Sequence, residues 1–247
     1  MNILTTAVIK GGTGKTTTAA AIAQAAAKAR KKVLCVDLDP QGNFTAFLDA
    51  APTAPGCYEL ITGQAPAAGL IQKTGQKISV IAASPNLATL KTTPGSAKRL
   101  QAALEPVKGD FDLIMIDTPP QIGETTYNAL QACNGLLIPL EADSSSLQGL
   151  YQILDLAQHM RENSNPDLSF IGVLLTRYDS RPNVNRYLKE TIQETAQESG
   201  AAFLGCVRAG IAIREAQGMG QSLFEYAPKS NPAADYLEIY RAIKKNL

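Results

Sequence analysis

Residue types that can bind phosphate stand close together near the amino terminus. An apolar run at 3–9 precedes them and an alanine-rich stretch at 16–30 begins within them. The segment consists of Lys10, Gly11, Gly12, Thr13, Gly14, Lys15, Thr16 and Thr17. Glycines let the backbone approach an anion and direct several N–H groups at it, and a helix amino terminus favours the same charge. We predict a strand, a phosphate loop and a helix, with Lys15 at the outer phosphates and the Thr16 hydroxyl on Mg²⁺.

The first position of this loop is irregular. The pattern G-x-x-x-x-G-K-[ST] requires glycine at position 9, and the chain has Ile9 there. It has instead a second lysine, Lys10, at the head of the loop. A glycine-rich turn that merely caps a helix is the simpler alternative, but such a turn needs neither lysine. The two lysines therefore favour phosphate chemistry.

Two further apolar runs end in carboxylates. Residues 33–36 precede Asp37 and Asp39, and residues 113–116 precede Asp117. Continuous apolar runs of this length are typical of buried parallel strands, whose carboxyl ends meet at one edge of a sheet. We expect Asp39 beside the phosphate loop, where it can orient water or hold Mg²⁺ through water, and Asp117 near the metal. An Asp-Pro turn and a helix-capping aspartate are the alternatives.

The elements that must position these groups alternate along the rest of the chain. Apolar runs predict strands at 78–82, 135–140, 170–176 and 203–207, and helices are predicted at 98–107, 147–160, 188–199 and from Pro232 onward. Residues 49–77 are rich in Ala, Pro and Gly, which predicts surface loops around one short helix at 58–62. The expected fold is α/β, one domain over 1–247, with helices on both faces of a twisted, mostly parallel sheet.

Composition limits the classes of partner. The 247 residues carry a net charge of +1, so nucleic-acid binding requires a local basic patch. Four distant cysteines indicate reduced thiols, mostly buried, in the cytoplasm. We expect no signal peptide and no membrane-spanning segment. His159, the sole histidine, has no partner motif and is interpreted as a surface or packing residue.

The loop KGGTGKTT resembles the deviant Walker A motif of the ParA/MinD family of ATPases. The runs DLDPQGN and FDLIMIDTPP are similar to that group as well, and IGVLLTRYDSR, IAIREAQ and SLFEYAPKS indicate its ParA/Soj branch. The resemblance implies the three-layer P-loop NTPase fold with ATP and Mg²⁺, in a small type without an amino-terminal helix-turn-helix domain. It also implies an ATP-dependent homodimer with weak intrinsic ATPase activity.

The same resemblance implies roles for individual residues. Two subunits would close face to face around two ATP molecules, so that Lys10 reaches the partner's nucleotide. Lys15 would bind its own β- and γ-phosphates and Thr16 the Mg²⁺. Asp39 would position the attacking water, Asp117 would hold Mg²⁺ through water, and Asp37 would support the loop.

DNA binding is the second property that the family implies. Arg181 and Lys229 match its DNA-contacting positions, and the contacts would be to double-stranded DNA without sequence preference. The stretch 207–213 lacks the family's proline and two arginines, and Arg208 and Arg214 are the candidates to replace them. A ParB-like centromere-binding protein is the expected partner, and the nucleoid is the expected location. The cargo could be a plasmid, a mobile element or a chromosome.

Other functions on a similar fold remain as alternatives. A MinD-like membrane switch requires a basic amphipathic segment beyond the last core helix, and the sequence stops at 244–247. A dethiobiotin-synthetase-like ligase does not account for Lys10 or DLDPQGN. A bacterial tyrosine kinase usually ends in a tyrosine cluster, and here only Tyr236 and Tyr240 lie near the end. A nitrogenase-iron-protein-like role requires paired cysteines, for which Cys133 alone gives weak support.

Overall fold

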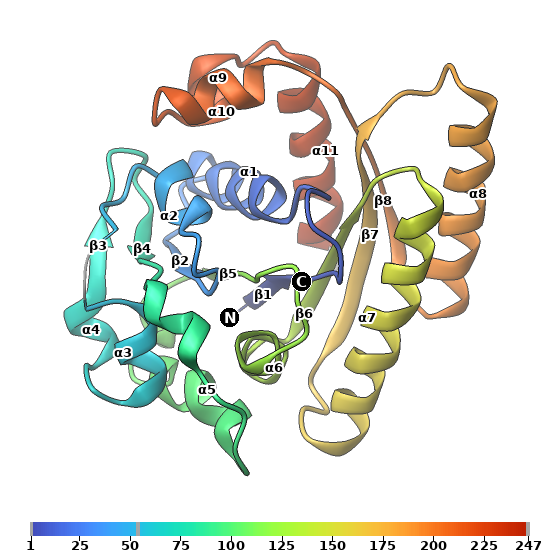
Figure 1. The fold of residues 1–247 in the computed structure, drawn as a ribbon. Coiled ribbons are helices and arrows are strands. Elements are labelled where there is room, and N and C mark those ends of the chain that lie inside the picture. Colours follow the sequence, from blue (N-terminus) through green and yellow to red (C-terminus); the bar gives the residue numbers. More distant parts are fainter. Residues whose placement is uncertain (1, 53–54, 246–247) are drawn as a thin grey trace.

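The computed structural model describes residues 2–52 and 55–245, and within them the strands form one eight-stranded sheet (Figure 1). The strand order is β3-β4-β2-β5-β1-β6-β7-β8. The bounds are β1 (Asn2–Thr6), β2 (Val33–Asp37), β3 (Ile71–Lys73), β4 (Ser79–Ile81), β5 (Leu113–Asp117), β6 (Gly135–Leu140), β7 (Ser169–Tyr178) and β8 (Ala202–Arg208). All neighbouring strands pair in parallel except β3, which runs antiparallel to β4 at one edge.

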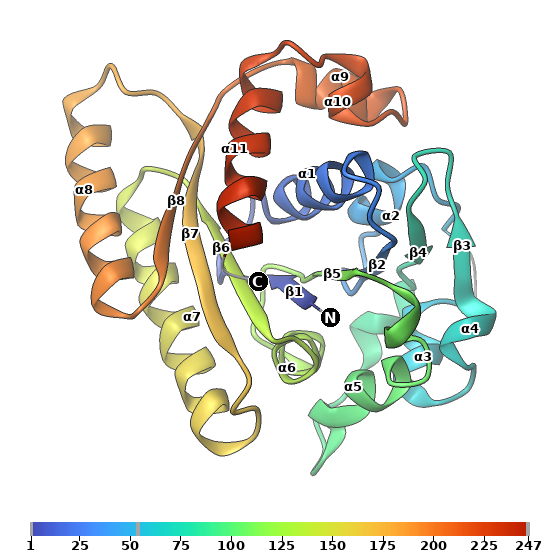
Figure 2. The same ribbon diagram turned by 180° about the vertical axis from the view of Figure 1, so that it is seen from behind.

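Helices cover both faces of this sheet, as Figures 1 and 2 show from opposite sides. Helix α1 lies with α2, α9, α10 and α11 over one face, and the helices from α3 to α8 lie over the other. Their bounds are α1 (Lys15–Lys28), α2 (Asn43–Phe47), α3 (Cys57–Thr62), α4 (Ala67–Leu70), α5 (Arg99–Leu104), α6 (Glu124–Ala132), α7 (Ser144–Asn163), α8 (Asn183–Glu198), α9 (Ala212–Gly218), α10 (Leu223–Tyr226) and α11 (Asn231–Lys245). Short 3₁₀ turns occupy Pro85–Thr89, Ser96–Lys98 and Lys108–Asp110. The predicted α/β class and the parallel sheet with helices on both faces are thus confirmed.

The strand register brings the carboxylates together. Asp37 at the end of β2 pairs with Asp117 at the end of β5, and Asp117 pairs with Thr6 at the end of β1. Helix α1 follows β1 after the phosphate loop, and most of its alanines are buried, which lets its backbone pack closely on the sheet. The central strands therefore fix three polar side chains at one edge, directly below the phosphate loop.

Several predicted boundaries were wrong. Residues 49–77 contain not only α3 but also α4 and β3, because a three-residue edge strand is too short to show a period. The helix predicted at 98–107 spans only Arg99–Leu104. Helix α7 starts at Ser144, because the Asp143 carboxylate caps it, and the first turn of α8 is largely exposed and so gave no apolar signal.

Other expectations from the sequence hold. His159 is exposed on α7, and all four cysteines are free, three of them buried. The helix predicted from Pro232 onward is α11, which packs on the domain through Tyr236, Ile239 and Ile243. No helix in the described ranges is long and apolar enough to cross a membrane. Residues 246 and 247 of the stretch 244–247 lie outside the described residues.

Candidate nucleotide site

The phosphate loop runs from the end of β1 to the start of α1. Gly12 and Gly14 have φ of 78° and 84°, backbone angles that residues other than glycine rarely adopt. A Cβ on Gly14 would also lie 3.1 Å from Thr176 Cγ2. The Thr176 hydroxyl donates a 2.8 Å hydrogen bond to the Thr13 carbonyl and so fastens the loop to β7. Both glycines are thus required by the path of the loop.

Asp117 and Thr16 meet directly beneath this loop. The Thr16 hydroxyl donates to Asp117 Oδ2 at 2.6 Å, and the Thr6 hydroxyl donates to Oδ1 at 3.0 Å. Burial, and then the nearby Asp37 carboxylate, raise the pKa of Asp117 to about 7. A hydroxyl and a carboxylate that converge in this way are the oxygen ligands that Mg²⁺ prefers, directly or through water. The pair fits a magnesium site.

Asp37 supports the neighbouring loop, as expected. Its carboxylate accepts hydrogen bonds from the Thr45 amide (2.8 Å), the Thr45 hydroxyl (2.7 Å) and the Asp39 amide (3.1 Å). Burial raises its pKa to about 6, against the effect of the hydrogen bonds from Thr45. Asp39 itself is buried, accepts from the Gln41 amide and lines the same cavity as Lys15 and Thr16. Asp37 thereby holds the loop that presents Asp39.

Lys15 is buried at the floor of the loop. Its ammonium donates a 2.8 Å hydrogen bond to the Lys10 carbonyl. Burial lowers its pKa, while Asp117 and Asp39 oppose this shift. The buried Thr13 hydroxyl has no hydrogen-bond partner among the described residues. A buried cation beside an unpartnered hydroxyl and left-handed glycines is suited to a phosphate chain. We call this space, whose lining includes Gly12, Lys15, Thr16, Asp39 and Gln41, the phosphate cavity.

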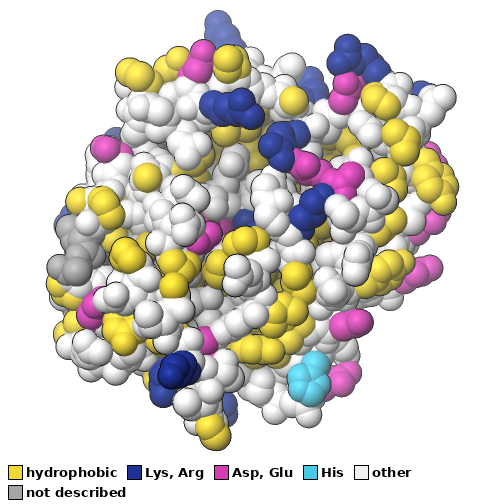
Figure 3. Space-filling view, viewed as in Figure 1, with side chains coloured by type: hydrophobic (Ala, Val, Ile, Leu, Met, Phe, Trp, Pro, Cys, Tyr) yellow, Lys and Arg dark blue, Asp and Glu magenta, His cyan; other side chains and the backbone are white. Residues whose placement is uncertain are grey.

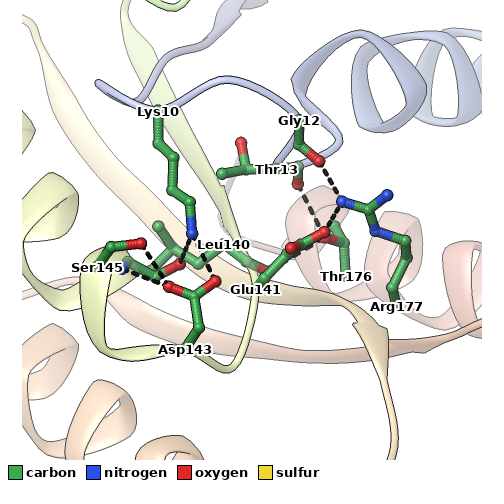
Figure 4. Close-up of polar contacts among 10 residues, drawn as sticks. Lys10, Gly12, Thr13, Leu140, Glu141, Asp143, Ser145, Thr176 and Arg177 are labelled. Atoms are coloured by element: carbon green, nitrogen blue, oxygen red, sulfur yellow. Dashed lines mark hydrogen bonds and ion pairs between the residues drawn. The ribbon is translucent and has the colours of Figure 1, made fainter.

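Lys10 points away from that cavity. Figure 4 shows its side chain directed at the Asp143 carboxylate, with which it forms a 2.5 Å ion pair, and Ser146 Oγ lies 3.4 Å from its ammonium. Burial opposes ionisation of Asp143, but hydrogen bonds from Lys10 and Ser145 lower its pKa to about 2. Lys10 does not line the phosphate cavity. Its ammonium is therefore bound to a carboxylate of the same chain and lies outside the phosphate cavity.

A second space, which we call the side cleft, joins the phosphate cavity at Gly12, Gly14 and Thr17. Its volume is about 570 Å³, within the usual range for small-molecule sites. No sequence pattern predicts this cleft, because its lining comes from segments that are distant in the chain. It includes Arg177, Val207, Gly210, Arg214 and Tyr236. A nucleotide with its phosphates on the loop can place its nucleoside here.

The three arginines and one lysine proposed for DNA binding do not form a single cluster of unpaired charges. Arg181 is 89% exposed, with its guanidinium on Asp179. Arg208 makes two hydrogen bonds to the Asp235 carboxylate, at 3.0 and 2.6 Å. Arg214 lines the side cleft, and Lys229 is exposed between α10 and α11. Figure 3 likewise shows basic and acidic side chains intermingled on the upper part of the molecule.

Comparisons with known proteins agree with this geometry. A family model described as an AAA domain matches residues 1–170, which include Lys10, Lys15, Asp39 and Asp117. The chain is 33% identical over 244 residues to the sporulation initiation inhibitor protein Soj of Bacillus subtilis, covering 96% of each chain. It is 33% identical over 243 residues to the chromosome partitioning protein ParA of Myxococcus xanthus, covering 96% of this chain and 85% of that protein.

Among solved structures, cobyrinic acid a,c-diamide synthase of Mycobacterium smegmatis, with bound ATP analog and magnesium, has a TM-score of 0.82. The identity is 29%, and the match covers 100% of this chain and 95% of that one. A protein of this fold thus binds an ATP analog with magnesium, the ligands that the phosphate loop and the Thr16–Asp117 pair fit.

Proposed function

Because the chain belongs to the ParA/Soj family of ATPases, we propose that it is a DNA-segregation ATPase. It hydrolyses ATP with Mg²⁺. In the proposed cycle, ATP closes two subunits into a dimer that binds DNA without sequence preference. Hydrolysis, stimulated by a ParB-like partner, then releases the dimer. We further propose that residues 1–247 act as one ATPase domain and that the protein associates with the nucleoid.

The position of Lys10 is the observation that carries this proposal. Its ammonium is bound to Asp143 and does not line its own phosphate cavity. A lysine at the head of a phosphate loop can reach the phosphates of a nucleotide bound to a second subunit if the two loops face each other. A cation supplied in this way stabilises charge in the transition state, an effect worth about 10³–10⁵ in rate for an arginine finger. In this proposal Lys15 and Thr16 bind the subunit's own ATP and Mg²⁺, and Asp39 positions water.

The DNA surface is proposed along the edge formed by the β7–α8 loop and the α10–α11 connection. These two segments lie at the same edge of the molecule in Figures 1 and 2. Arg181 and Lys229 are the exposed cations of these segments that we assign to DNA phosphates. Arg214 on α9 and Arg208 at the end of β8 are assigned secondary contacts, because Asp235 already holds Arg208. A dimer doubles each contact and so raises affinity through avidity.

A mobility-shift titration with random-sequence duplex DNA tests this proposal. Binding is expected with ATP and Mg²⁺ but not with ADP or without nucleotide, and it should weaken steeply with salt. Arg181→Ala removes two phosphate contacts from the dimer. The slope of log K against log salt should therefore become shallower by about 1.8.

Arg99→Ala is the matched control, because Arg99 is exposed on α5, on the opposite face of the sheet from α9–α11. Its DNA affinity and salt slope should equal those of the wild type. An absence of DNA binding under all nucleotide conditions, or equal losses in the two variants, would refute the proposed DNA surface.

A further inference from the structure

Arg177, the penultimate residue of β7, has a backbone conformation that requires explanation. Its φ is 50°, in the left-handed region that a residue with a bulky side chain rarely adopts. This conformation directs its side chain toward the phosphate loop, where Nη2 donates a 2.5 Å hydrogen bond to the Gly12 carbonyl. The side chain is still 54% exposed, so packing alone does not account for it. Unusual backbone conformations of this kind concentrate at binding sites.

A carboxylate holds Arg177 in this position. Figure 4 shows the Glu141 side chain, at the carboxyl end of β6, directed at the Arg177 guanidinium, with which it forms an ion pair. Apart from this ion pair, the buried Glu141 Oε1 has no hydrogen-bond partner among the described residues. Arg177 is therefore the cation that neutralises Glu141 in this structure.

Arg177 lines the side cleft but not the phosphate cavity. It stands next to Gly12, one of the residues that both spaces share. A nucleotide with its phosphates on the loop thus meets this guanidinium with its sugar or base rather than with its outer phosphates. A guanidinium is a planar cation that can stack on a base and donate hydrogen bonds to ring nitrogens or hydroxyls.

We propose that Arg177 is a nucleotide-binding residue that contacts the nucleoside part of ATP in the side cleft, and that Glu141 competes for it. In the nucleotide-free protein, the ion pair with Glu141 holds the Arg177 guanidinium beside the phosphate loop. Nucleotide binding draws the guanidinium away from Glu141 and onto the base or ribose. The ion pair therefore lowers nucleotide affinity, while Arg177 itself raises it.

The proposal concerns nucleotide binding alone and does not depend on DNA binding. Its test therefore contains no DNA, and its failure would leave the proposed DNA surface unaffected. Dissociation constants are measured by calorimetry, with Mg²⁺, for ADP, a non-hydrolysable ATP analogue and tripolyphosphate. Tripolyphosphate is the informative probe because it occupies the phosphate cavity without a nucleoside.

Arg177→Ala should raise the dissociation constants for ADP and the ATP analogue about tenfold, the effect of one lost cation–aromatic contact. The dissociation constant for tripolyphosphate should stay within about twofold of the wild-type value. Wild-type affinity for ADP, or an equal loss for tripolyphosphate, would overturn the proposal. The second outcome would mean that Arg177 only supports the loop through Gly12. If Arg177→Ala does not fold, Arg177→Lys keeps a donor for Gly12 without the planar group. Arg177→Lys should then weaken the binding of ADP but not that of tripolyphosphate. Equal effects on the binding of both ligands would overturn the proposal.

Glu141→Gln tests the competition. It should strengthen ADP binding about threefold, because the charge that holds the guanidinium is removed. The double variant Arg177→Ala/Glu141→Gln should bind ADP like Arg177→Ala alone. Weaker binding by Glu141→Gln, or a gain that persists without Arg177, would refute the role of Glu141. Arg186→Ala, at an exposed arginine on α8, is the matched control and should bind all three ligands like the wild type.

Discussion

Neutralising Asp143 should make the protein dimerise more tightly in the presence of ATP. In the nucleotide-free subunit the Asp143 carboxylate holds Lys10 through a 2.5 Å ion pair. A dimer in which each Lys10 reaches the partner's nucleotide must break this pair twice. Asp143→Asn removes the charge but keeps an oxygen that can accept from the Ser146 amide, so the cap of α7 remains.

The size of the effect follows from the exposure of the pair. The Asp143 pKa of about 2 lies below the ordinary aspartate value of 3.8, a difference that corresponds nominally to about 2.5 kcal/mol. Part of that shift comes from Ser145 and Ser146, and the Asp143 side chain is 38% exposed, so water screens the pair. About 1 kcal/mol per subunit remains. Two pairs give about 2 kcal/mol, or a dimer dissociation constant about 30-fold lower than that of the wild type.

Sedimentation velocity over a protein dilution series, with Mg²⁺ and a non-hydrolysable ATP analogue, measures this constant. Asp155→Asn is the matched control, because Asp155 is exposed on the same helix and has no ion pair with a described residue. Without nucleotide, Asp143→Asn should stay monomeric, since Lys10 then has no phosphate to reach. A dissociation constant equal to or higher than that of the wild type would refute the reasoning, as would dimers without nucleotide.

Two further predictions concern the buried carboxylates. Asp37→Asn should lower the free energy of unfolding, measured by urea denaturation, by about 1–3 kcal/mol. Three donors now converge on the carboxylate, and the amide NH₂ of asparagine would face at least one of them. An unchanged denaturation midpoint would contradict a stabilising role for these hydrogen bonds. Without Mg²⁺, the melting temperature should fall as pH rises from 5 to 8. The folded pKa values of Asp37 (about 6) and Asp117 (about 7) are raised above the unfolded values, so the folded state holds protons whose stabilising effect is lost across this range. Asp117→Asn should flatten this decline, and a melting temperature that rises with pH in the metal-free wild type would contradict it.

The parts of the site that the sequence predicts are local. Eight consecutive positions determine the phosphate loop, and Asp37, Asp39 and Asp117 each follow an apolar run that is typical of a buried strand. The parallel register then carries these residues to one edge of the sheet without further information. The fold class followed from the same alternation of apolar runs and helices.

The parts that the sequence did not predict depend on contacts between distant segments or on buried polar groups. Lys10 with Asp143 and Arg177 with Glu141 are pairs separated by many residues, and no local pattern joins them. The side cleft is built from the phosphate loop, the carboxyl ends of β7 and β8, helix α9 and Tyr236 of α11. Helix α6 was not predicted because its buried face includes Asn128 and Gln131, which give no apolar period.

A mixing experiment tests most directly whether Lys10 acts on the partner's nucleotide. Lys10→Ala and Asp39→Ala should each have very low ATPase activity alone. In a mixed dimer, the Asp39→Ala subunit supplies Lys10 to the site of the Lys10→Ala subunit, which retains Asp39, so one of the two sites is complete. Half of the dimers in an equimolar mixture are mixed, so the account predicts about a quarter of wild-type activity. If Lys10 acts within its own subunit, neither site is complete, and a mixture no more active than the separate variants would contradict the account.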